Sequence, residues 1–213
     1  MKIIQLFFFC LLIVYETTGQ GITKNGQITS TSTHFIDTNG KTGSVPMIQK
    51  NGQVFVKIGD SYKGGIVAYI LQVGDPGYDA SIQHGVIAVA SYQSLGVEWG
   101  CVNTAISGAD GTVLGTGNQN TIEIMAGCTT AGIAARICGD LALNDYSDWY
   151  LPSKDELNKL YINRVVVGGF STDNHWSSSE VDNNAAWYHN FDNGLQSSAW
   201  KTAPLRVRAI RTF

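Results

Sequence analysis

Short apolar runs separated by glycine, proline and asparagine dominate the hydrophobic pattern of this chain. Three such runs lie at residues 54–58, 65–71 and 85–90. Each is rich in β-branched residues and bounded by turn-forming residues, which is typical of buried strands rather than helices. The pattern predicts a domain of short antiparallel strands that begins near Val54.

Two segments show a helical pattern instead. Apolar residues recur at helical spacing within residues 130–143, which predicts one amphipathic helix. A second helix is expected after Ser153, because Ser153 and Glu156 have the spacing of a capping box. Asp155 and Glu156 would then lie at the positive end of this helix, where carboxylates favour capping over acid–base chemistry.

Residues 20–53 are polar and differ from the rest of the chain. They carry Asn-Gly pairs at 25–26, 39–40 and 51–52. Asn-Gly is a strong hairpin signal, because both residues tolerate positive φ. We expect a β-rich N-terminal extension or linker, followed by the main domain at 54–213.

The first 19 residues have the pattern of a secretory signal peptide. Lys2 precedes an apolar run at 3–15, which is shorter than the roughly 20 residues of a membrane-spanning helix. Cleavage is expected just after Gly19, and no later apolar run is long enough to cross a membrane. The sequence therefore predicts a secreted or cell-surface protein.

Net charge and composition limit the classes of partner that the chain is expected to bind. The chain of 213 residues has a formal net charge of -3 and no block of Lys or Arg. Sequence-independent nucleic-acid binding needs a basic face that displaces counterions from phosphates. No nucleic-acid partner is predicted.

Three cysteines remain once the signal segment is removed. Cys128 and Cys138 fall at the start of and inside the first predicted helix, where ten residues span about 15 Å, too far for a bridge. One disulfide is expected, joining Cys101 to Cys128 or Cys138, with the third cysteine as a buried thiol. A redox or copper-binding pair is disfavoured, since neither CxxC spacing nor a neighbouring His is present.

The last third of the chain carries an ordered set of aromatic and polar motifs. They are Tyr146–Leu157, Trp176–Glu180, Ala186–Trp187, Phe191–Gly194 and Val207–Arg211, with Gly59–Tyr62 and Ala134–Cys138 upstream. In this order they resemble the Lcl C-terminal domain family over most of residues 54–213. The resemblance implies an α+β domain of C-type-lectin-like architecture, related to formylglycine-generating enzymes and found on exported bacterial proteins. It also implies binding rather than catalysis, since the name-giving member attaches to sulfated glycans.

Two departures limit what the resemblance transfers. Sulfated glycans need clustered cations, whereas Lys154, Lys159 and Arg164 are spread along one predicted helix, and collagen-like repeats are absent. Formylglycine-generating enzymes use a cysteine pair near the end of the chain, and no cysteine follows Cys138. Heparin-like binding and oxidase activity are therefore not expected.

No catalytic constellation stands out. The Trp176 indole is expected in the core, and the three serines after it are expected in a tight turn where their hydroxyls satisfy backbone groups. A serine nucleophile is not expected, because no Gly-x-Ser-x-Gly elbow is present. Glu180 is expected to brace Arg206, Arg208 or Arg211. The four histidines lack metal-binding spacing. An enzyme would need a perturbed carboxylate such as Asp155 or Glu180.

Candidate recognition chemistry surrounds residues 182–201. Oxygen-bearing side chains beside an exposed aromatic are what a sugar site uses, with or without calcium. The candidate ligand-binding residues are Asp182, Asn183, Asn184, Trp187, Tyr188, Asp192, Trp200 and Lys201. The alternatives are that Asp and Asn only build hairpin turns and that Trp187 faces the core.

The sequence thus predicts an exported, non-catalytic binding module for glycan or another cell-surface ligand, without a required cofactor. The alternative is a structural or adhesive cell-envelope protein that makes its contacts through the Asn-Gly-rich N-terminal segment.

Overall fold

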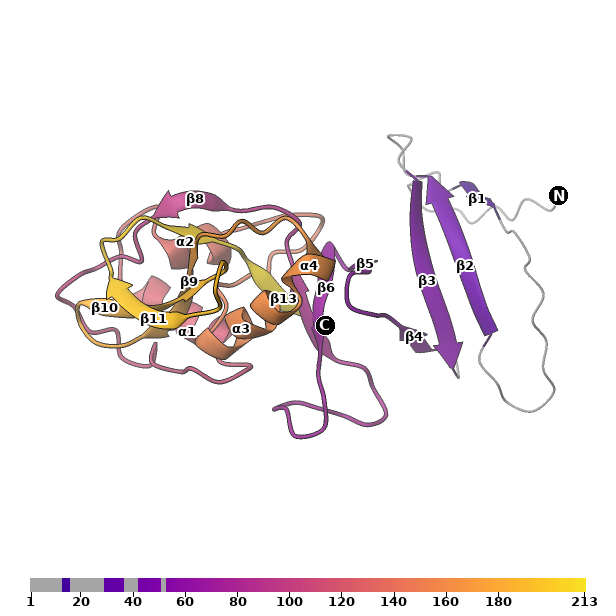
Figure 1. The fold of residues 1–213 in the computed structure, drawn as a ribbon, viewed down its shortest axis with the longest axis horizontal. Coiled ribbons are helices and arrows are strands. Elements are labelled where there is room, and N and C mark those ends of the chain that lie inside the picture. The colour runs from indigo at the N-terminus through magenta and orange to yellow at the C-terminus, as the bar shows by residue number, and fades with distance from the viewer. Residues whose placement is uncertain (1–12, 16–28, 37–41, 51–52) are drawn as a thin grey trace. The chain divides into compact units, whose positions relative to one another are not determined.

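The structure is a computed structural model that describes residues 13–15, 29–36, 42–50 and 53–213. The chain divides into two compact units, Met1–Val56 and Lys57–Phe213. The described residues form both strands and helices, with strands the more numerous, so the architecture is mixed α+β (Figure 1). In the part of the chain that is described, no helix has the length and apolar character to cross a membrane.

The N-terminal unit contains a four-stranded antiparallel sheet. Its strands, in the order β1-β2-β3-β4, are β1 (Ile13–Tyr15), β2 (Thr29–Ile36), β3 (Thr42–Lys50) and β4 (Gln53–Phe55). The three Asn-Gly pairs lie outside the described residues, as does the predicted signal peptide apart from β1. Val54 and Phe55 pair with β3, so they extend this sheet and do not open the main domain.

The C-terminal unit contains two sheets. The five-stranded sheet has the order β11-β10-β9-β12-β8 and consists of β8 (Ser94–Val97), β9 (Asn174–Glu180), β10 (Ala185–Asn190), β11 (Gln196–Trp200) and β12 (Leu205–Val207). The four-stranded sheet has the order β13-β7-β6-β5 and consists of β5 (Ser61–Tyr62), β6 (Gly65–Ile70), β7 (Gly85–Ala88) and β13 (Ile210–Thr212). The strands predicted at 65–71 and 85–90 are confirmed as β6 and β7.

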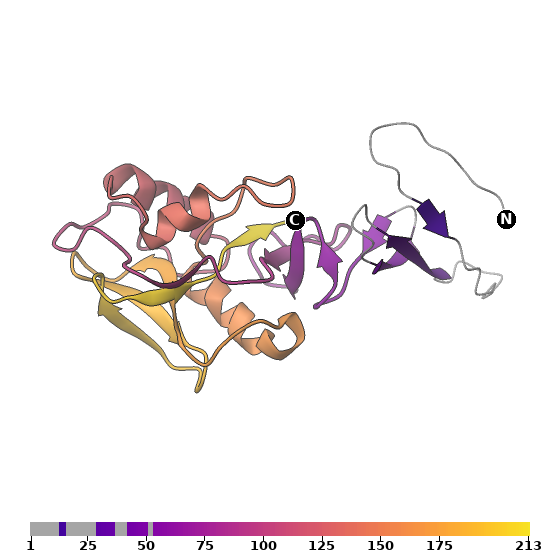
Figure 2. The same ribbon diagram turned by 90° about the horizontal axis from the view of Figure 1, so that it is seen from above.

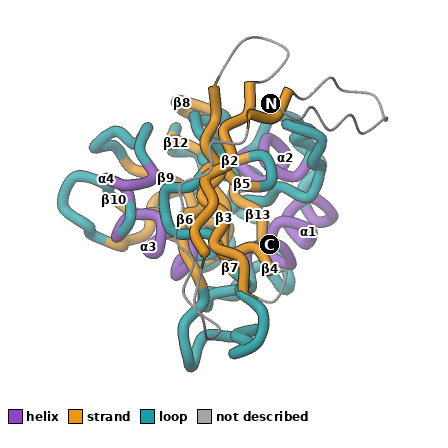
Figure 3. Tube along the Cα trace, turned by 90° about the vertical axis from the view of Figure 1, so that its right-hand side faces the viewer, coloured by secondary structure: helices purple, strands orange, loops and turns teal. Residues whose placement is uncertain are grey.

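Helices cover both sides of these strands. They are α1 (Gly117–Gly127), α2 (Ala134–Gly139), α3 (Lys154–Ile162) and α4 (Arg164–Val167). Figures 2 and 3 show α1 and α2 on one side of the strands and α3 and α4 on the other. Each side has its own core: Trp99, Trp149 and Trp176 lie on the α1–α2 side, and Leu157 and Phe191 lie on the α3 side.

The two helix predictions had different outcomes. The capping box at α3 is confirmed, since the Ser153 side chain accepts the Glu156 N–H and the Glu156 carboxylate accepts the Ser153 N–H at 2.7 Å. The helix predicted at 130–143 is shorter than expected. It begins only after Gly132, whose φ is +70°, and ends at Gly139. After Gly139 the chain leaves the helix, and it then turns at Asn144 and Asp145, which both have positive φ.

The sequence did not predict α1, because the buried side of that helix is partly polar. Asn120 and Thr121 are buried there and donate to backbone carbonyls of Gly111 and Leu151, respectively. These hydrogen bonds satisfy polar groups in the core. A search for apolar periodicity cannot detect such a helix.

The serine run after Trp176 also differs from the prediction, because it forms the buried strand β9 and not a tight turn. The Ser177 hydroxyl donates to Trp187 O at 2.8 Å and the Ser179 hydroxyl to Gly111 O at 2.7 Å. As predicted, the Trp176 indole is fully buried. The hydroxyls thus satisfy backbone groups, but across strands and loops.

Candidate functional site

The β10–β11 hairpin holds both tryptophans of the predicted site on one face. Trp187 lies opposite Ser198, and Ala185 lies opposite Trp200. Side chains two residues apart on a strand share a face, so Trp187 and Trp200 are diagonal neighbours on the same side. Trp200 is 65% exposed and Trp187 is partly buried.

The first turn of α3 lies beside these rings. The Gln196 side chain donates to Lys154 O at 2.9 Å, which ties the start of the helix to β11. The Lys154 ammonium lies 4.9 Å from the centroid of the Trp187 ring, within cation–π range. We call Lys154, Trp187, Ser198 and Trp200 the tryptophan face.

The loop at 182–184 is next to the tryptophan face, because Lys201 N donates to Asn184 O at 2.8 Å. Asp182 Oδ1 accepts the N–H groups of Asn184 and Ala185, at 2.7 and 2.9 Å. Asp182 therefore stabilises the turn, as the turn interpretation predicted, while Asp182 and Asn183 remain exposed.

Asp192 lies at the other end of β10. In that turn the Asn190 side chain accepts the N–H groups of Asp192 and Asn193, at 2.9 and 3.0 Å. The six residues of β10 separate the two turns by about 20 Å at roughly 3.3 Å per residue. The structure does not bring Asp192 together with Asp182, so Asp192 is not part of the candidate site.

Tyr188 points away from the tryptophan face. Consecutive strand residues alternate between the two sides of a sheet, and Tyr188 packs against the core on the α1–α2 side. The prediction that Trp187 and Tyr188 act together was therefore wrong. The strand alternation in the sequence was sufficient to separate them.

Lys201 is also wrong as a ligand-binding residue, because its side chain is fully buried. It follows Trp200 on the opposite side of the strand and forms an ion pair with Glu180. Its ammonium also donates to Thr104 O at 2.7 Å, and both carboxylate oxygens of Glu180 lie 3.0 Å from Ile106 N. This pair is a buried structural link.

The arginines that were expected to brace Glu180 have other partners. Arg206 pairs with Asp173 at 2.6 Å and Arg211 pairs with Asp148 at 2.7 Å. Arg208 is buried and donates to the carbonyls of Val89, Gly168 and Gly169. Burial lowers the pKa of the Arg208 guanidinium to about 10.

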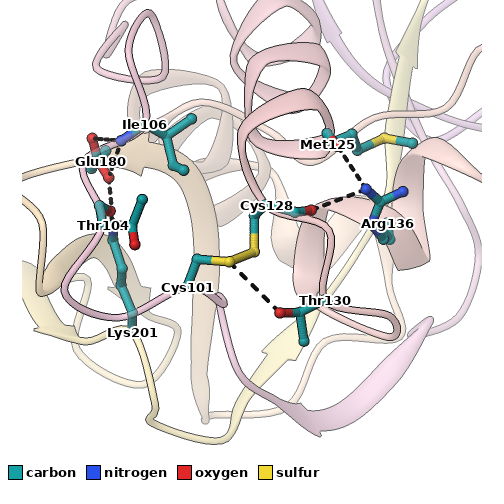
Figure 4. The surroundings of a disulfide bond; sticks show 9 residues. All are labelled: Cys101, Thr104, Ile106, Met125, Cys128, Thr130, Arg136, Glu180 and Lys201. Atoms are coloured by element: carbon teal, nitrogen blue, oxygen red, sulfur yellow. Dashed lines mark hydrogen bonds and ion pairs between the residues drawn. A yellow bond between two sulfur atoms is a disulfide. The ribbon is translucent and has the colours of Figure 1, made fainter.

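Cys101 forms a disulfide with Cys128, so the structure selects one of the two partners that the sequence left open (Figure 4). Cys138 is a free, buried thiol in α2, and burial raises its pKa. The bridge closes a loop of 27 residues onto the end of α1. Thr104 and Ile106, which contact Lys201 and Glu180, lie within this loop.

The acidic residues considered for catalysis have structural partners. Burial raises the pKa of Glu156, although hydrogen bonds from Ser153 and Gly115 act in the opposite direction. Its oxygens also accept the Tyr150 hydroxyl, at 3.2 Å. Glu156 lines a mainly apolar hollow of about 320 Å³, away from the tryptophan face. Asp155 is partly exposed and lies 3.8 Å from the Lys154 ammonium.

Histidines contribute to packing. His175 and His189 are fully buried, and burial lowers the pKa of each to about 4. His189 stacks on Tyr161 of α3, with ring centroids 4.6 Å apart. Among the described residues, no group of three or more His, Cys, Asp or Glu side chains is arranged to hold a metal ion.

Sequence reasoning missed Lys154 and Ser198 as members of this site. The capping box already placed Lys154 at the first turn of α3, but its position over Trp187 depends on the packing of α3 against β10. Ser198 could have been found by counting back two residues from Trp200 along a strand.

Comparisons with known proteins agree with the α+β architecture. A fimbrial protein from Bacteroides ovatus ATCC 8483 is similar in fold, with a TM-score of 0.52 at 14% sequence identity. The match covers 88% of this chain and 57% of that protein, so the chain spans little more than half of its length. No curated protein matches the chain.

The family comparison covers the candidate site. The profile of the Lcl C-terminal domain matches residues 95–211, which is more than half of the chain and includes α1–α4 and β9–β12. The match begins later than residue 54, where the sequence resemblance was expected to start. The chain belongs to the Lcl C-terminal domain family.

Proposed function

We propose that residues 57–213 form a non-catalytic binding module of an exported, cell-surface protein, and that the tryptophan face contacts carbohydrate. The C-type-lectin-like relationship implied by the sequence and the signal peptide at 1–19 are part of this proposal.

The observation that carries the proposal is the placement of Trp187 and Trp200 on one side of the β10–β11 hairpin. A single exposed aromatic on a protein surface needs no special explanation. Here two tryptophans lie diagonally on the same side of the hairpin, and one of them, Trp200, is 65% exposed. Sugar rings offer C–H faces for stacking and hydroxyls for hydrogen bonds, and tryptophan combines both kinds of contact.

Charge favours an uncharged glycan over a sulfated one. Lys154 is the one cation among the four residues of the tryptophan face. Its ammonium lies over the Trp187 ring and 3.8 Å from the Asp155 carboxylate. Asp182 adds a negative charge in the neighbouring turn. A polyanion would need several convergent cations.

The carboxylate geometry supports binding without calcium and without catalysis. A calcium site gathers six to eight oxygen ligands. Asp182 and Asp192 lie at opposite ends of β10, and one oxygen of Asp182 already accepts two backbone N–H groups. Glu180, which was one candidate for acid–base chemistry, is held by Lys201 and Ile106 N.

A structural or adhesive cell-envelope role is the second candidate. It is favoured by the likeness in fold to a fimbrial protein. In that role the surface contacts would be to other proteins of the envelope, and the tryptophan face would not discriminate between sugars.

A glycan array probed with the chain from residue 20 onward tests the proposal. We expect selective binding to uncharged glycans, equal in calcium and in chelator, that is lost in Trp187→Ala and Trp200→Ala. Tyr78→Ala is the control, since Tyr78 is 39% exposed and lies outside the tryptophan face. Absence of binding by folded protein would favour the second candidate, and unchanged binding by Trp200→Ala would reject the site.

A further inference from the structure

Among the residues that the structure describes, β11 is an edge strand of the five-stranded sheet. Its strand neighbour in the structure is β10, and the sheet order ends at β11. An edge strand presents unpaired N–H and C=O groups that can pair with another strand.

The hydrogen-bonding register shows which groups face outward. Asn190 N donates to Leu195 O and Lys201 N donates to Asn184 O, both at 2.8 Å. In an antiparallel pair the hydrogen-bonded residues alternate, so Ser197 and Ala199 pair with β10. The backbone groups of the intervening residues point away from β10. These residues are Gln196, Ser198 and Trp200.

β11 also lacks the features that usually protect an edge. Its sequence, Gln-Ser-Ser-Ala-Trp, contains no charge, proline or glycine over five residues. The other sheet ends in the C-terminal unit differ. β5 is two residues long and precedes Lys63, β13 contains Arg211, and β8 contains Gly96.

We infer that β11 pairs antiparallel with β11 of a second copy of this chain. In the register centred on Ser198, the two Ser198 residues exchange backbone hydrogen bonds, and Gln196 lies opposite Trp200 at both ends. This register uses all three outward-facing residues of each strand and sets no like charges against each other. It gives a closed two-fold interface to which each subunit contributes its own β11.

The side chains fit this register. On one side of the sheet Ser197 lies opposite Ala199, and both are small. On the other side Ser198 lies opposite Ser198, and Gln196 lies opposite Trp200. Directly opposed residues of an antiparallel pair project to the same side of the sheet. The tryptophan faces of both subunits therefore lie on one side of a joined sheet. The interface inference itself does not depend on carbohydrate binding.

Sedimentation velocity of the full chain from low to high micromolar concentration tests the inference. A five-residue strand pair buries less than the roughly 1,200–2,000 Å² of a stable interface, so we expect a weak, concentration-dependent dimer. Ser198→Lys places two ammonium groups opposite each other and should weaken the dimer by about tenfold or more. Ser107→Lys adds the same charge at an exposed loop residue and should leave the dimer unchanged.

A cross-linking variant adds a direct readout of the register. Directly opposed residues of a strand pair lie within the Cα–Cα range of a disulfide. Ser198→Cys should form a covalent dimer under oxidised glutathione, and Ser107→Cys should not. A chain that stays monomeric throughout, a Ser198→Lys variant that dimerises as the parent does, or Ser198→Cys cross-linking no faster than Ser107→Cys would each overturn the inference.

Discussion

The two faces of the β10–β11 hairpin are made by alternate residues of the same strands, yet they have different surroundings. On one face, Tyr188, Ala186 and Ala199 join the core beside α1 and α2. On the other face, Tyr161 of α3 stacks on His189, whereas Trp200 is 65% exposed. The difference shows that alternate residues of one strand can pack in the core on one face and leave the other face free for the binding that we propose. Substitutions on the two faces should therefore have separable effects.

Lys201→Met should have the largest effect on stability. The substitution leaves the Glu180 carboxylate near Ile106 N without its buried cation. Removing one partner of a buried ion pair costs about 3–5 kcal/mol. Urea unfolding followed by circular dichroism measures this loss. A change below about 0.5 kcal/mol, the usual range for surface substitutions, would show that Lys201 is not part of the core.

Tyr188→Ala should come next, because it removes an aromatic ring from the core face. Tyr188 is only partly buried, so we expect a loss of about 2 kcal/mol, less than for a fully buried aromatic. The same unfolding assay measures it, with glycan binding as the second readout. Loss of binding without loss of stability would return Tyr188 to the ligand site.

His189→Phe should change how stability depends on pH. The folded pKa of His189 is about 4, below the ordinary value of 6.5, so the unfolded state takes up the proton first as pH falls. Stability should therefore decrease from pH 6.5 towards pH 4, by about 1.4 kcal/mol per pH unit for this group. Phenylalanine keeps a ring against Tyr161 and removes this contribution.

Burial also lowers the pKa of His175, so His175 should still contribute to the pH dependence of stability in His189→Phe. Unfolding curves at pH 7, 5.5 and 4.5, in both proteins, separate the two histidines. An identical slope in parent and His189→Phe would contradict the burial of an uncharged His189.

Trp200→Ala should have the smallest effect on stability, within about 0.5 kcal/mol, because the side chain is 65% exposed. Its effect on carbohydrate affinity should be about tenfold or more, since each 1.4 kcal/mol of lost contact changes affinity tenfold. Thermal unfolding and titration with a glycan selected on the array measure the two quantities. A large stability loss would place Trp200 in the core with Tyr188.

Local patterns in the sequence predicted local structure well. The capping box defined the start of α3, and the short β-branched runs predicted β6 and β7. The polar side of α1 could not be predicted, because Asn120 and Thr121 donate to Gly111 O and Leu151 O, which only the folded chain brings to the helix.

The candidate site was predicted only in part, for a related reason. Its tryptophans were identified, but Lys201 was misplaced because its partner Glu180 is brought near by the fold. Alternation along β10 and β11 could have separated Trp187 from Tyr188 and Trp200 from Lys201 without a structure. The Lys154 contact required the packing of α3 against β10.

An NMR titration of the tryptophan indole N–H signals with an uncharged oligosaccharide tests the central claim most directly. Of the five tryptophans, Trp99, Trp149 and Trp176 are buried and act as internal controls. We expect the Trp187 and Trp200 signals to shift together while the other three stay in place. Binding that shifts neither of these two signals would contradict the assignment of the tryptophan face as the ligand site.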